Sequence, residues 1–599
     1  MTGQPEYLPM TVAEAERLGI DQFDIILVTG DAYVDHPSFG TALLGRVLVD
    51  AGYTVGVIAQ PDWKSGDDLR RLGEPRLFFS VSAGNVDSLV NAFTPNLKRR
   101  HSDVYSPGGR LLRPDRATLV YTDRIHALFP ETPIVIGGIE ASLRRFAHYD
   151  YWSDAVRQSI LADAPADLLV FGMGERQVVA IADRLAAGET ARALTEIPGT
   201  AYRVEKKVWR GMDQSGYVVL PGYPEVKDDR YAYAKAFAMH YAEQDPLRGR
   251  PVAQPHPKTV VVQNPPAMPL SGDELDRVYE LPYTRRAHPS YTEPIPALEP
   301  VRFSVVTHRG CFGACSFCAL THHQGRIIQS RSADSIVREV ERMAKMPEFT
   351  GVVQDVGGPT ANMYGIHCSR GETAGTCPDR RCIDCPALDR SHEEQVSLLR
   401  RIRELPRVKR VFIASGIRYD LIPDDREYLS EVSTHHVSGH LKVAPEHVSK
   451  RVLASMGKPS REVFDAFRER FEALQEGKKK RQYLVPYLMS GHPGCRIADM
   501  VELAEYVRDT GLYTEQVQDF TPTPMSISTT IYHTGLDPFT LEEVYVPKGR
   551  EKRVQRALMH YRDPENYPLV CEGLRAAGRE DLIGSAWGCL VPARRKKKR

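Results

Sequence analysis

The chain has 599 residues, of which 42% are hydrophobic, and its formal net charge is +1. This length predicts several domains, and the near-neutral charge argues against a chain that binds nucleic acid over its whole surface. No apolar run is long enough to span a bilayer, residues 1–18 lack the apolar segment of a signal peptide, and none of the ten cysteines lies in the first half, so we expect a reduced cytoplasmic protein.

Residues 1–190 alternate apolar runs with amphipathic helices. The apolar runs are Asp24–Gly30, Tyr53–Ala59, Arg76–Val81, Thr132–Gly138 and Asp167–Gly172, with a helix at Ser38–Ala51 between the first two. Continuous apolar runs are typical of parallel strands that are covered on both faces. The pattern predicts an α/β unit with a doubly wound, Rossmann-like parallel sheet, whose glycine-rich strand ends form a ligand crevice.

Residues 191–298 are rich in proline and tyrosine and show weak periodicity. Prolines break regular structure, so we interpret this segment as a long connector with one short helix at Gly272–Val278. The residues from Leu281 to Pro289 could line an active-site mouth, and a rigid linker fixed by proline is the alternative.

From residue 299 to 535 the alternation of strands and helices resumes. The predicted strands are Val301–Thr307, Gly351–Val356, Arg410–Ala414, Gly439–Val443, Gln482–Leu488 and Thr514–Asp519. Helices are expected at Ala333–Lys345, Glu393–Leu405 and after Ser460. Six such repeats predict a parallel sheet that curls into a partial (β/α)6 barrel.

Three cysteines follow the first of these strands at C-x3-C-x2-C spacing, namely Cys311, Cys315 and Cys318. Three thiolates on one loop can hold an iron–sulfur cluster and leave its fourth iron open. A zinc site or buried cysteines without a metal are the alternatives. The carboxyl end of a barrel strand is where such folds keep their chemistry, which favours the cluster.

The spacing, with Phe317 beside the last cysteine, resembles that of the radical SAM superfamily. Over nearly its whole length the chain resembles the YgiQ family of that superfamily. The resemblance is carried by the segments Val28–Pro37, Gly137–Ser142, the Cys311 loop, Gly358–Tyr364, Lys442–His447 and Val546–Gly549. The resemblance implies a [4Fe–4S] cluster whose open iron is chelated by S-adenosylmethionine (SAM). It also implies reductive cleavage of SAM to a 5′-deoxyadenosyl radical that modifies an unknown substrate.

The resemblance also implies SAM contacts at successive strand ends. Gly357 and Gly358 take the place of the superfamily's GGE motif, with Pro359 where the Glu would be. The other expected contacts are Ser415, Arg418, Lys442, Glu446, Val517 and Gln518.

The N-terminal half resembles the cobalamin-binding type of domain, but its nearest match to the D-x-H-x-x-G motif is Asp35–Gly40, with the wrong spacing. We therefore expect the cobalamin-binding-like fold without that cofactor, and interpret His36 as a polar loop residue rather than a cobalt ligand.

Four further cysteines, Cys368, Cys377, Cys382 and Cys385, lie in a polar insertion at residues 366–390. They could bind an auxiliary cluster or a structural zinc, and an inert reduced loop is the alternative. Residues 536–599 are expected to form a C-terminal extension with a helix near Lys552–Tyr561 and a basic tail, Arg594–Arg599.

The expected function is thus a radical SAM enzyme with a one-electron donor such as flavodoxin or ferredoxin and no membrane partner. One rival hypothesis is an RNA-modifying enzyme with the same chemistry, suggested by the basic tail. A rival from another class is a non-catalytic iron–sulfur or zinc protein, which would not bind SAM.

Overall fold

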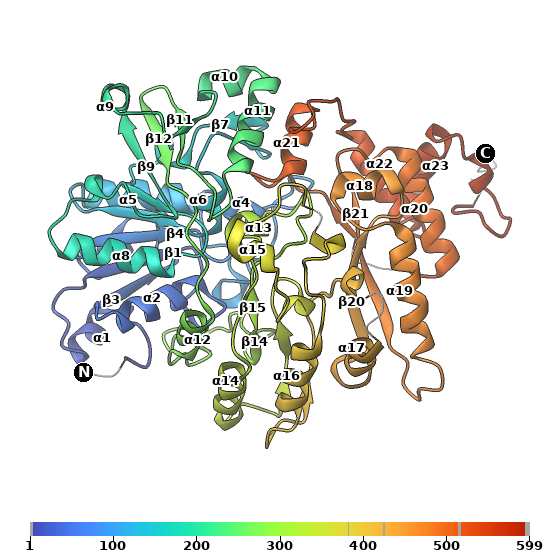
Figure 1. The fold of residues 1–599 in the computed structure, drawn as a ribbon, viewed down its shortest axis with the longest axis horizontal. Helices are drawn as coiled ribbons and strands as arrows, with labels where there is room; N and C mark the ends of the chain where they lie inside the picture. Colours follow the sequence, from blue (N-terminus) through green and yellow to red (C-terminus); the bar gives the residue numbers. More distant parts are fainter. Residues whose placement is uncertain (1–3, 381, 423–425, 513–516, 593–599) are drawn as a thin grey trace, which may run out of the picture.

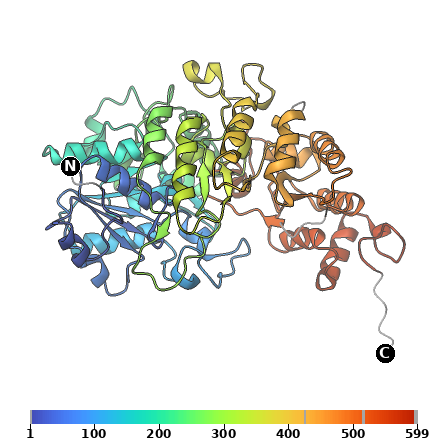
Figure 2. The ribbon, with the colours of Figure 1, turned by 90° about the horizontal axis from the view of Figure 1, so that it is seen from below.

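The computed structural model describes residues 4–380, 382–422, 426–512 and 517–592. Two α/β units lie side by side in Figure 1, the N-terminal unit on the left and the second extending from the centre to the right. C-terminal helices follow on the right, and Figure 2 shows the same succession from below. The predicted α/β class is confirmed.

Five parallel strands form the centre of the N-terminal sheet, in the spatial order β3-β1-β4-β5-β8. They are β1 (Ile25–Thr29), β3 (Val55–Ala59), β4 (Phe78–Ser82), β5 (Ile134–Gly137) and β8 (Leu168–Val170), which fall within the predicted apolar runs. β3, which follows β1 in this sheet along the chain, lies at the edge next to β1, as in the doubly wound order of flavodoxin-like sheets.

Helices cover both faces of this sheet and explain the continuous apolar runs. Along β1, Ile25 and Leu27 face one core while Ile26 and Val28 face another. The first core includes side chains of α2 (Gly40–Asp50) and α8 (Glu175–Ala186), and the second includes α3 (Asp67–Arg70) and α5 (Ala117–Leu128). Each strand must therefore be apolar at every position.

The segment 191–298 differs from the expected connector, because it completes the same sheet. Antiparallel strands continue beyond β8 in the order β9-β12-β11, and β10 pairs in parallel with β11. These strands are β9 (Thr200–Glu205), β10 (Val218–Val219), β11 (Val252–Pro255) and β12 (Thr259–Gln263). Helices α9 (Lys206–Gly211), α10 (Tyr223–Asp228) and α11 (Arg230–Ala242) lie between them, and the predicted helix is α12 (Gly272–Glu280). The prolines stand mainly between or at the ends of these elements, where a missing N–H is tolerated.

The second unit contains the predicted run of parallel strands. They are β14 (Ser304–Val306), β17 (Val352–Val353), β18 (Asp355–Gly357), β19 (Arg410–Val411), β20 (His440–Glu446), β21 (Tyr483–Ser490) and β22 (Val517–Asp519). β14 pairs with β18, β17 with β19, and β20 with β21 and then β22, all in parallel. A parallel bridge between Ile417 and Val443 joins the two halves. The predicted second strand is thus split into β17 and β18, and the sheet forms a partial barrel.

Helices of the second unit cover the outside of these strands. They include α14 (Ala333–Lys345), α16 (Glu393–Arg403), α17 (Arg426–Glu431), α18 (Lys450–Met456), α19 (Arg461–Ala473) and α20 (Ile497–Thr510). Beyond them lie α21 (Ile527–Thr534), α22 (Arg550–Met559) and α23 (Tyr567–Ala576), of which α22 is the predicted C-terminal helix. The basic tail lies outside the described residues, so its contact with RNA stays a prediction.

None of the helices in the described part of the chain combines the length and the apolar character that a membrane span needs.

Buried ion pairs join the two units. Arg309, on the short strand β15 (His308–Arg309), places Nη1 2.6 Å from Glu175 Oε1 at the start of α8. Both side chains are almost fully buried, and the Arg309 Nε also donates to the hydroxyl of Tyr279 at 3.2 Å. A second buried pair joins Arg285 to Glu339 of α14. The position of β15 therefore depends on a charge in the N-terminal unit.

We expect Glu175→Gln to lower the free energy of unfolding by about 3–5 kcal/mol, because it leaves the buried Arg309 guanidinium without a charged partner. Urea denaturation of the full chain measures this change. Glu274→Gln is the matched control, since Glu274 pairs with the neighbouring Arg176 at a much more exposed site and should cost less than about 1 kcal/mol. Equal effects of the two substitutions would contradict the role given to the buried pair.

Candidate functional site

The cysteine loop runs from β15 to α13 (Leu320–Gln324) and is held by backbone hydrogen bonds from several directions. The Cys311 N–H donates to Gly325 O at 3.2 Å and the Ser316 N–H to Met456 O at 2.9 Å, while the Ser316 carbonyl accepts from the Ser528 N–H at 2.9 Å. The loop therefore has one defined path.

Gly310 is required at the entry of this loop. Its φ is +85°, and a Cβ there would lie 2.2 Å from the carbonyl oxygen of Ile327. Only glycine combines a left-handed backbone with this close approach.

The three predicted cysteines are partly exposed as residues, but the sulfur atoms of Cys311 and Cys318 are largely buried, and both are affected by the charge of Cys315. Burial raises the pKa of the Cys318 thiol to about 12, and the charges of Cys315 and Cys311 add to this effect. Burial likewise raises the pKa of Cys311, against the opposing charge of Arg418. These mutual effects place the three sulfurs within electrostatic reach of one another.

A single zinc ion and an iron–sulfur cluster, the two metal centres that the sequence left open, require different arrangements of the cysteine sulfurs. Among the residues that the structure describes, no three His, Cys, Asp or Glu side chains converge on a point where one metal ion could bind. A zinc ion would hold each sulfur about 2.3 Å away and would need such convergence. A cubane cluster binds its cysteines through different iron atoms, so its sulfurs lie farther apart. The donor set fits a cluster better than a single ion.

Two largely buried cations lie near the thiols. Arg418 forms a bidentate pair with Asp420, at 3.0 and 2.6 Å, and points Nη1 at Cys315 Sγ, 3.8 Å away. Burial opposes its charge, but Asp420 and Cys315 outweigh burial and raise the pKa of Arg418. Lys458 lies 3.5 Å from Glu446, and its Nζ is 5.8 Å from the centre of the Phe317 ring. Its pKa is also raised, because Cys315 and Glu446 outweigh the effect of burial.

The glycine pair lies at the end of β18, as expected, but its carbonyl groups are not all free. Gly357 O accepts hydrogen bonds from the backbone and hydroxyl of Thr307, at 2.8 and 3.2 Å. A Cβ on Gly357 would lie 2.6 Å from Ser415 Oγ, and one on Gly358 would lie 2.6 Å from the His308 ring. Glycine is therefore needed here for packing as well as for access.

A buried polar atom without a partner lies beside this pair. His308 Nε2 forms no hydrogen bond within the described part of the chain, and burial lowers the pKa of this histidine to about 4. Buried polar atoms are nearly always hydrogen-bonded, so an unpaired one favours a missing polar ligand. Thr360 Oγ1, in the next turn, lies 3.9 Å from Cys311 Sγ.

The other predicted SAM contacts divide into two groups. Arg418, Glu446, Ser415 and the glycine pair gather around the loop, although Ser415 donates its hydroxyl to Asp355. Lys442 and Gln518 are exposed on β20 and β22, Val517 is buried in the apolar core, and no contact given for the described residues joins these three to the cysteines. These last roles stay predictions.

Lys458, Asp420 and His308 are site residues that the sequence analysis missed. Asp420 stands two positions from Arg418, a spacing that allows a local ion pair. Lys458 follows the left-handed glycine that ends α18, and no pattern in the sequence marks it.

The cysteines of the insertion also gather. Burial raises the pKa of Cys382, Cys377 and Cys368 raise it further, and Arg326 lowers it. Arg326 reaches this group directly, with Nη2 3.5 Å from Cys382 Sγ and Nη1 donating to Cys377 O at 2.9 Å. Cys382 and Cys368 pack in the same apolar cluster as Phe312 of the first loop. The insertion therefore covers one side of the Cys311 loop.

His36 is a buried polar residue. Its Nε2 lies 2.9 Å from Arg285 Nη1, and its Nδ1 accepts from the Ser38 N–H at 3.0 Å. The preceding Asp35 pairs with Arg46 at 2.7 Å, so this segment serves packing between elements.

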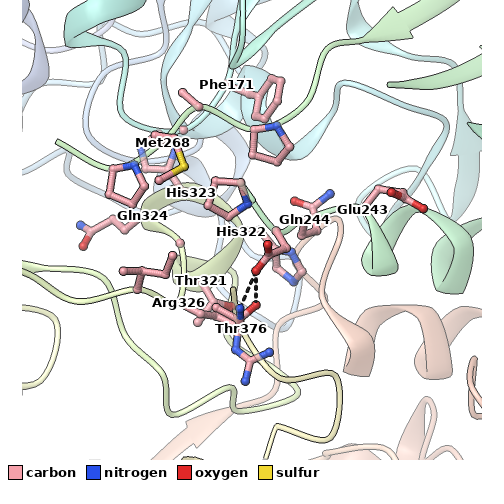
Figure 3. Close-up of a pocket in the computed structure, with 18 of the residues that line it drawn as sticks. Phe171, Glu243, Gln244, Met268, Thr321, His322, His323, Gln324, Arg326 and Thr376 are labelled. Atoms are coloured by element: carbon pink, nitrogen blue, oxygen red, sulfur yellow. Dashed lines mark hydrogen bonds between the residues drawn. The ribbon is translucent and has the colours of Figure 1, made fainter. Parts of the chain in front are cut away.

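A cavity of about 550 Å³ lies between the two units (Figure 3). Its walls come from the end of β8, the end of α11, the segment 321–327 that follows the cysteine loop, and the cysteine insertion. Apolar side chains such as Phe171, Tyr241 and Met268 alternate with His322, His323 and Gln244. Cavities of this size and character are typical of sites for small molecules.

Three family models together match almost the whole chain. The model described as "Radical SAM N-terminal" matches residues 7–304, "Radical SAM superfamily" matches residues 305–507, and "Domain of unknown function (DUF3362)" matches residues 515–599. The first match includes the segment 191–298, in agreement with its place in the N-terminal sheet.

Curated relatives are similar over nearly their full length. A "UPF0313 protein" of Methanosarcina acetivorans is 57% identical over 99% of this chain and 83% of its own, and one of Methanosarcina mazei is 55% identical over 98% and 100%.

Among solved structures, TsrM from Kitasatospora setae, with cobalamin and a [4Fe-4S] cluster bound, superimposes with a TM-score of 0.51 at 15% identity. The match covers 96% of this chain and 92% of TsrM. OxsB with aqua-cobalamin bound gives 0.50 at 10% identity, over 95% and 77%. These likenesses show a shared fold.

We expect Gly310→Ala to disrupt the cysteine loop, because the added methyl group would meet the Ile327 carbonyl. Iron bound per chain after anaerobic reconstitution should fall to a small fraction of the wild-type value. Gly511→Ala is the control: this glycine ends α20 away from the cysteine loop, its φ is +66° in the left-handed region, and nothing lies within 4 Å of a Cβ. It should keep its iron and lose only about 1–2 kcal/mol of stability from backbone strain. Equal iron contents in the two variants would refute this account of the loop.

Proposed function

The chain belongs to the UPF0313 family and is a radical SAM enzyme, and we propose that Cys311, Cys315 and Cys318 bind a [4Fe–4S] cluster whose fourth iron takes SAM. When bound, this pair of cofactors supplies one-electron cleavage of the sulfonium to a 5′-deoxyadenosyl radical, which abstracts hydrogen from a substrate. The three-thiol loop with Arg418 aimed at one sulfur is the observation that carries the proposal. Because the radical SAM family model matches residues 305–507, the rival hypothesis of a non-catalytic metal protein is rejected.

The residues around the loop have separate tasks in this proposal. Arg418 donates toward Cys315, and hydrogen bonds to cluster sulfurs raise the reduction potential. Lys458, near the Phe317 ring, stabilises the negative charge of the same thiolate. Gly357 and Gly358 allow Ser415 and His308 to pack closely against the end of β18, and the neutral His308 offers Nε2 to a polar group of the ligand. Phe312 and the cysteine insertion shield the loop from water.

We also propose that Cys368, Cys377, Cys382 and Cys385 hold a second metal centre. The support is the proximity of Cys382 to Cys377 and Cys368, together with the Arg326 guanidinium at Cys382. Such a cation would offset the negative charge of metal-bound thiolates, as outer partners of metal ligands commonly do. Since no three ligand side chains of the described residues converge on one point here either, a cluster fits this group better than a single zinc ion.

The first test is the formation of 5′-deoxyadenosine by the reconstituted enzyme with dithionite and SAM. We expect Cys315→Ala to reduce it at least a hundredfold, because a cluster held by two thiolates is not retained. Cys571→Ala should leave it unchanged, since Cys571 lies in α23, away from both cysteine loops. Product formation by Cys315→Ala at the wild-type rate would overturn the proposal.

The second test is metal content. Cys382→Ser should remove the metal of the insertion, while the three cysteines of the first loop keep their cluster. The total amount of iron and zinc bound per chain should therefore fall by the content of the insertion centre. The measurement is elemental analysis combined with the absorption spectrum of the reconstituted protein. Identical metal contents in Cys382→Ser and the wild type would mean that the insertion binds none.

A further inference from the structure

Arg145 is a buried cation without a carboxylate partner. It follows α6 (Gly138–Leu143), is fully buried, and donates to Gln263 Oε1 at 2.6 Å, to Gln244 Oε1 at 2.8 Å and to the carbonyl of Ser142. All of these acceptors are neutral. Burial with no compensating charge lowers the pKa of Arg145 to about 9.

This makes Arg145 an exception among the buried arginines. Four fully buried arginines rank among the largest side chains of the core, and the other three have carboxylates: Arg46 with Asp35, Arg309 with Glu175, and Arg331 with Glu339. Within the described residues, no ion pair is found for Arg145. A buried charge without a counter-ion has a large desolvation cost, so a protein retains one only where another interaction offsets that cost.

The cavity between the two units lies beside this charge. Phe171 and Gln244 both line the cavity and both touch Arg145, whose guanidinium carbon lies 4.6 Å from the centre of the Phe171 ring. Figure 3 shows Gln244 and His322 together on one wall. Burial and then the charge of Arg145 lower the pKa of His322 to about 3, so this imidazole is neutral and can donate or accept a hydrogen bond.

A second histidine ties the cavity to the motif that precedes Arg145. His323 Nδ1 lies 3.3 Å from Ser142 Oγ, which also accepts from the Gly172 N–H at 3.2 Å. The end of β5, the end of β8 and the segment after the cysteine loop therefore meet at one point. Ligand crevices of doubly wound sheets lie at such carboxyl ends of strands.

The carboxylates on the cavity wall each have an arginine partner. Glu243 pairs with Arg250 at 2.6 Å, Asp245 lies 3.7 Å from Arg248, and Arg176 pairs with Glu274. Arg326 faces the cysteine insertion. Within the described residues two arginines at the cavity have no carboxylate partner: Arg326, which lines the wall and is directed at Cys377 and Cys382, and Arg145, which lies behind Phe171 and Gln244.

We propose that this cavity binds a small ligand with an apolar body and an acidic group, a carboxylate or a phosphate, which lies against Gln244 and His322 and serves as the counter-ion of Arg145. The apolar walls contact the body of the ligand, and the neutral imidazoles hydrogen-bond its polar atoms. The proposal concerns binding only and holds whether or not SAM is cleaved at the cysteine loop.

The test is a fluorescence titration of the full chain with four naphthalene probes. 2-Naphthoate is compared with its neutral amide, 2-naphthamide, and 2-naphthyl phosphate with neutral 2-naphthol. We expect at least one acid to bind tenfold or more tightly than its neutral counterpart, and the two pairs separate a carboxylate site from a phosphate site. If neither acid binds better than its counterpart, the proposal is overturned.

Gln244→Glu provides the decisive variant. It places a carboxylate next to the Arg145 guanidinium, so the preference for the acid should vanish while the melting temperature rises. Gln22→Glu, which adds the same charge at an exposed site, should change neither quantity. A preference that survives in Gln244→Glu would refute the proposal. Cys315→Ala should keep the preference, which separates this result from any failure of the radical chemistry.

Discussion

The buried pair between Arg309 and Glu175 positions the chemistry of this protein. Arg309 stands two residues before Cys311, and its carboxylate partner belongs to the other α/β unit. A buried charge with one good partner has few alternative positions, because separating the pair leaves a charge in an apolar environment. The pair therefore fixes β15, the strand before the cysteines, relative to the N-terminal sheet. The cysteine loop begins directly after β15, so its position is fixed as well.

The same arrangement makes the N-terminal unit part of the site. The carboxyl ends of β5 and β8 face the segment 321–327, whose other contacts reach Gly310 and Cys311. One face of this short segment supports the cysteine loop, and the other lines the cavity beside Arg145. A ligand in the cavity and a cofactor at the cysteines would thus share a wall only a few residues thick.

Much of this organisation could be predicted from local patterns. The apolar runs Asp24–Gly30 and Thr132–Gly138 identify buried parallel strands, because both faces must be covered, and α14 has the expected bounds of Ala333–Lys345. The strands in 191–298 were missed because prolines lie between them and at their ends, so that no regular alternation of strands and helices develops. The three thiols could be predicted from their spacing. Lys458 could not, because it follows the end of α18, far along the chain from the cysteines. Arg145 could not have been identified, since lacking a carboxylate partner is a property of the whole fold and not of the residues around it.

The central claim is that three thiolates hold a cluster and leave one iron open to SAM. The most direct measurement is the electron paramagnetic resonance spectrum of the dithionite-reduced protein before and after addition of SAM. The account predicts a [4Fe–4S]⁺ signal whose g-values change when SAM is added, because a new ligand binds to the open iron. A cluster signal that stays the same at saturating SAM, or the absence of any cluster signal after reconstitution, would contradict it.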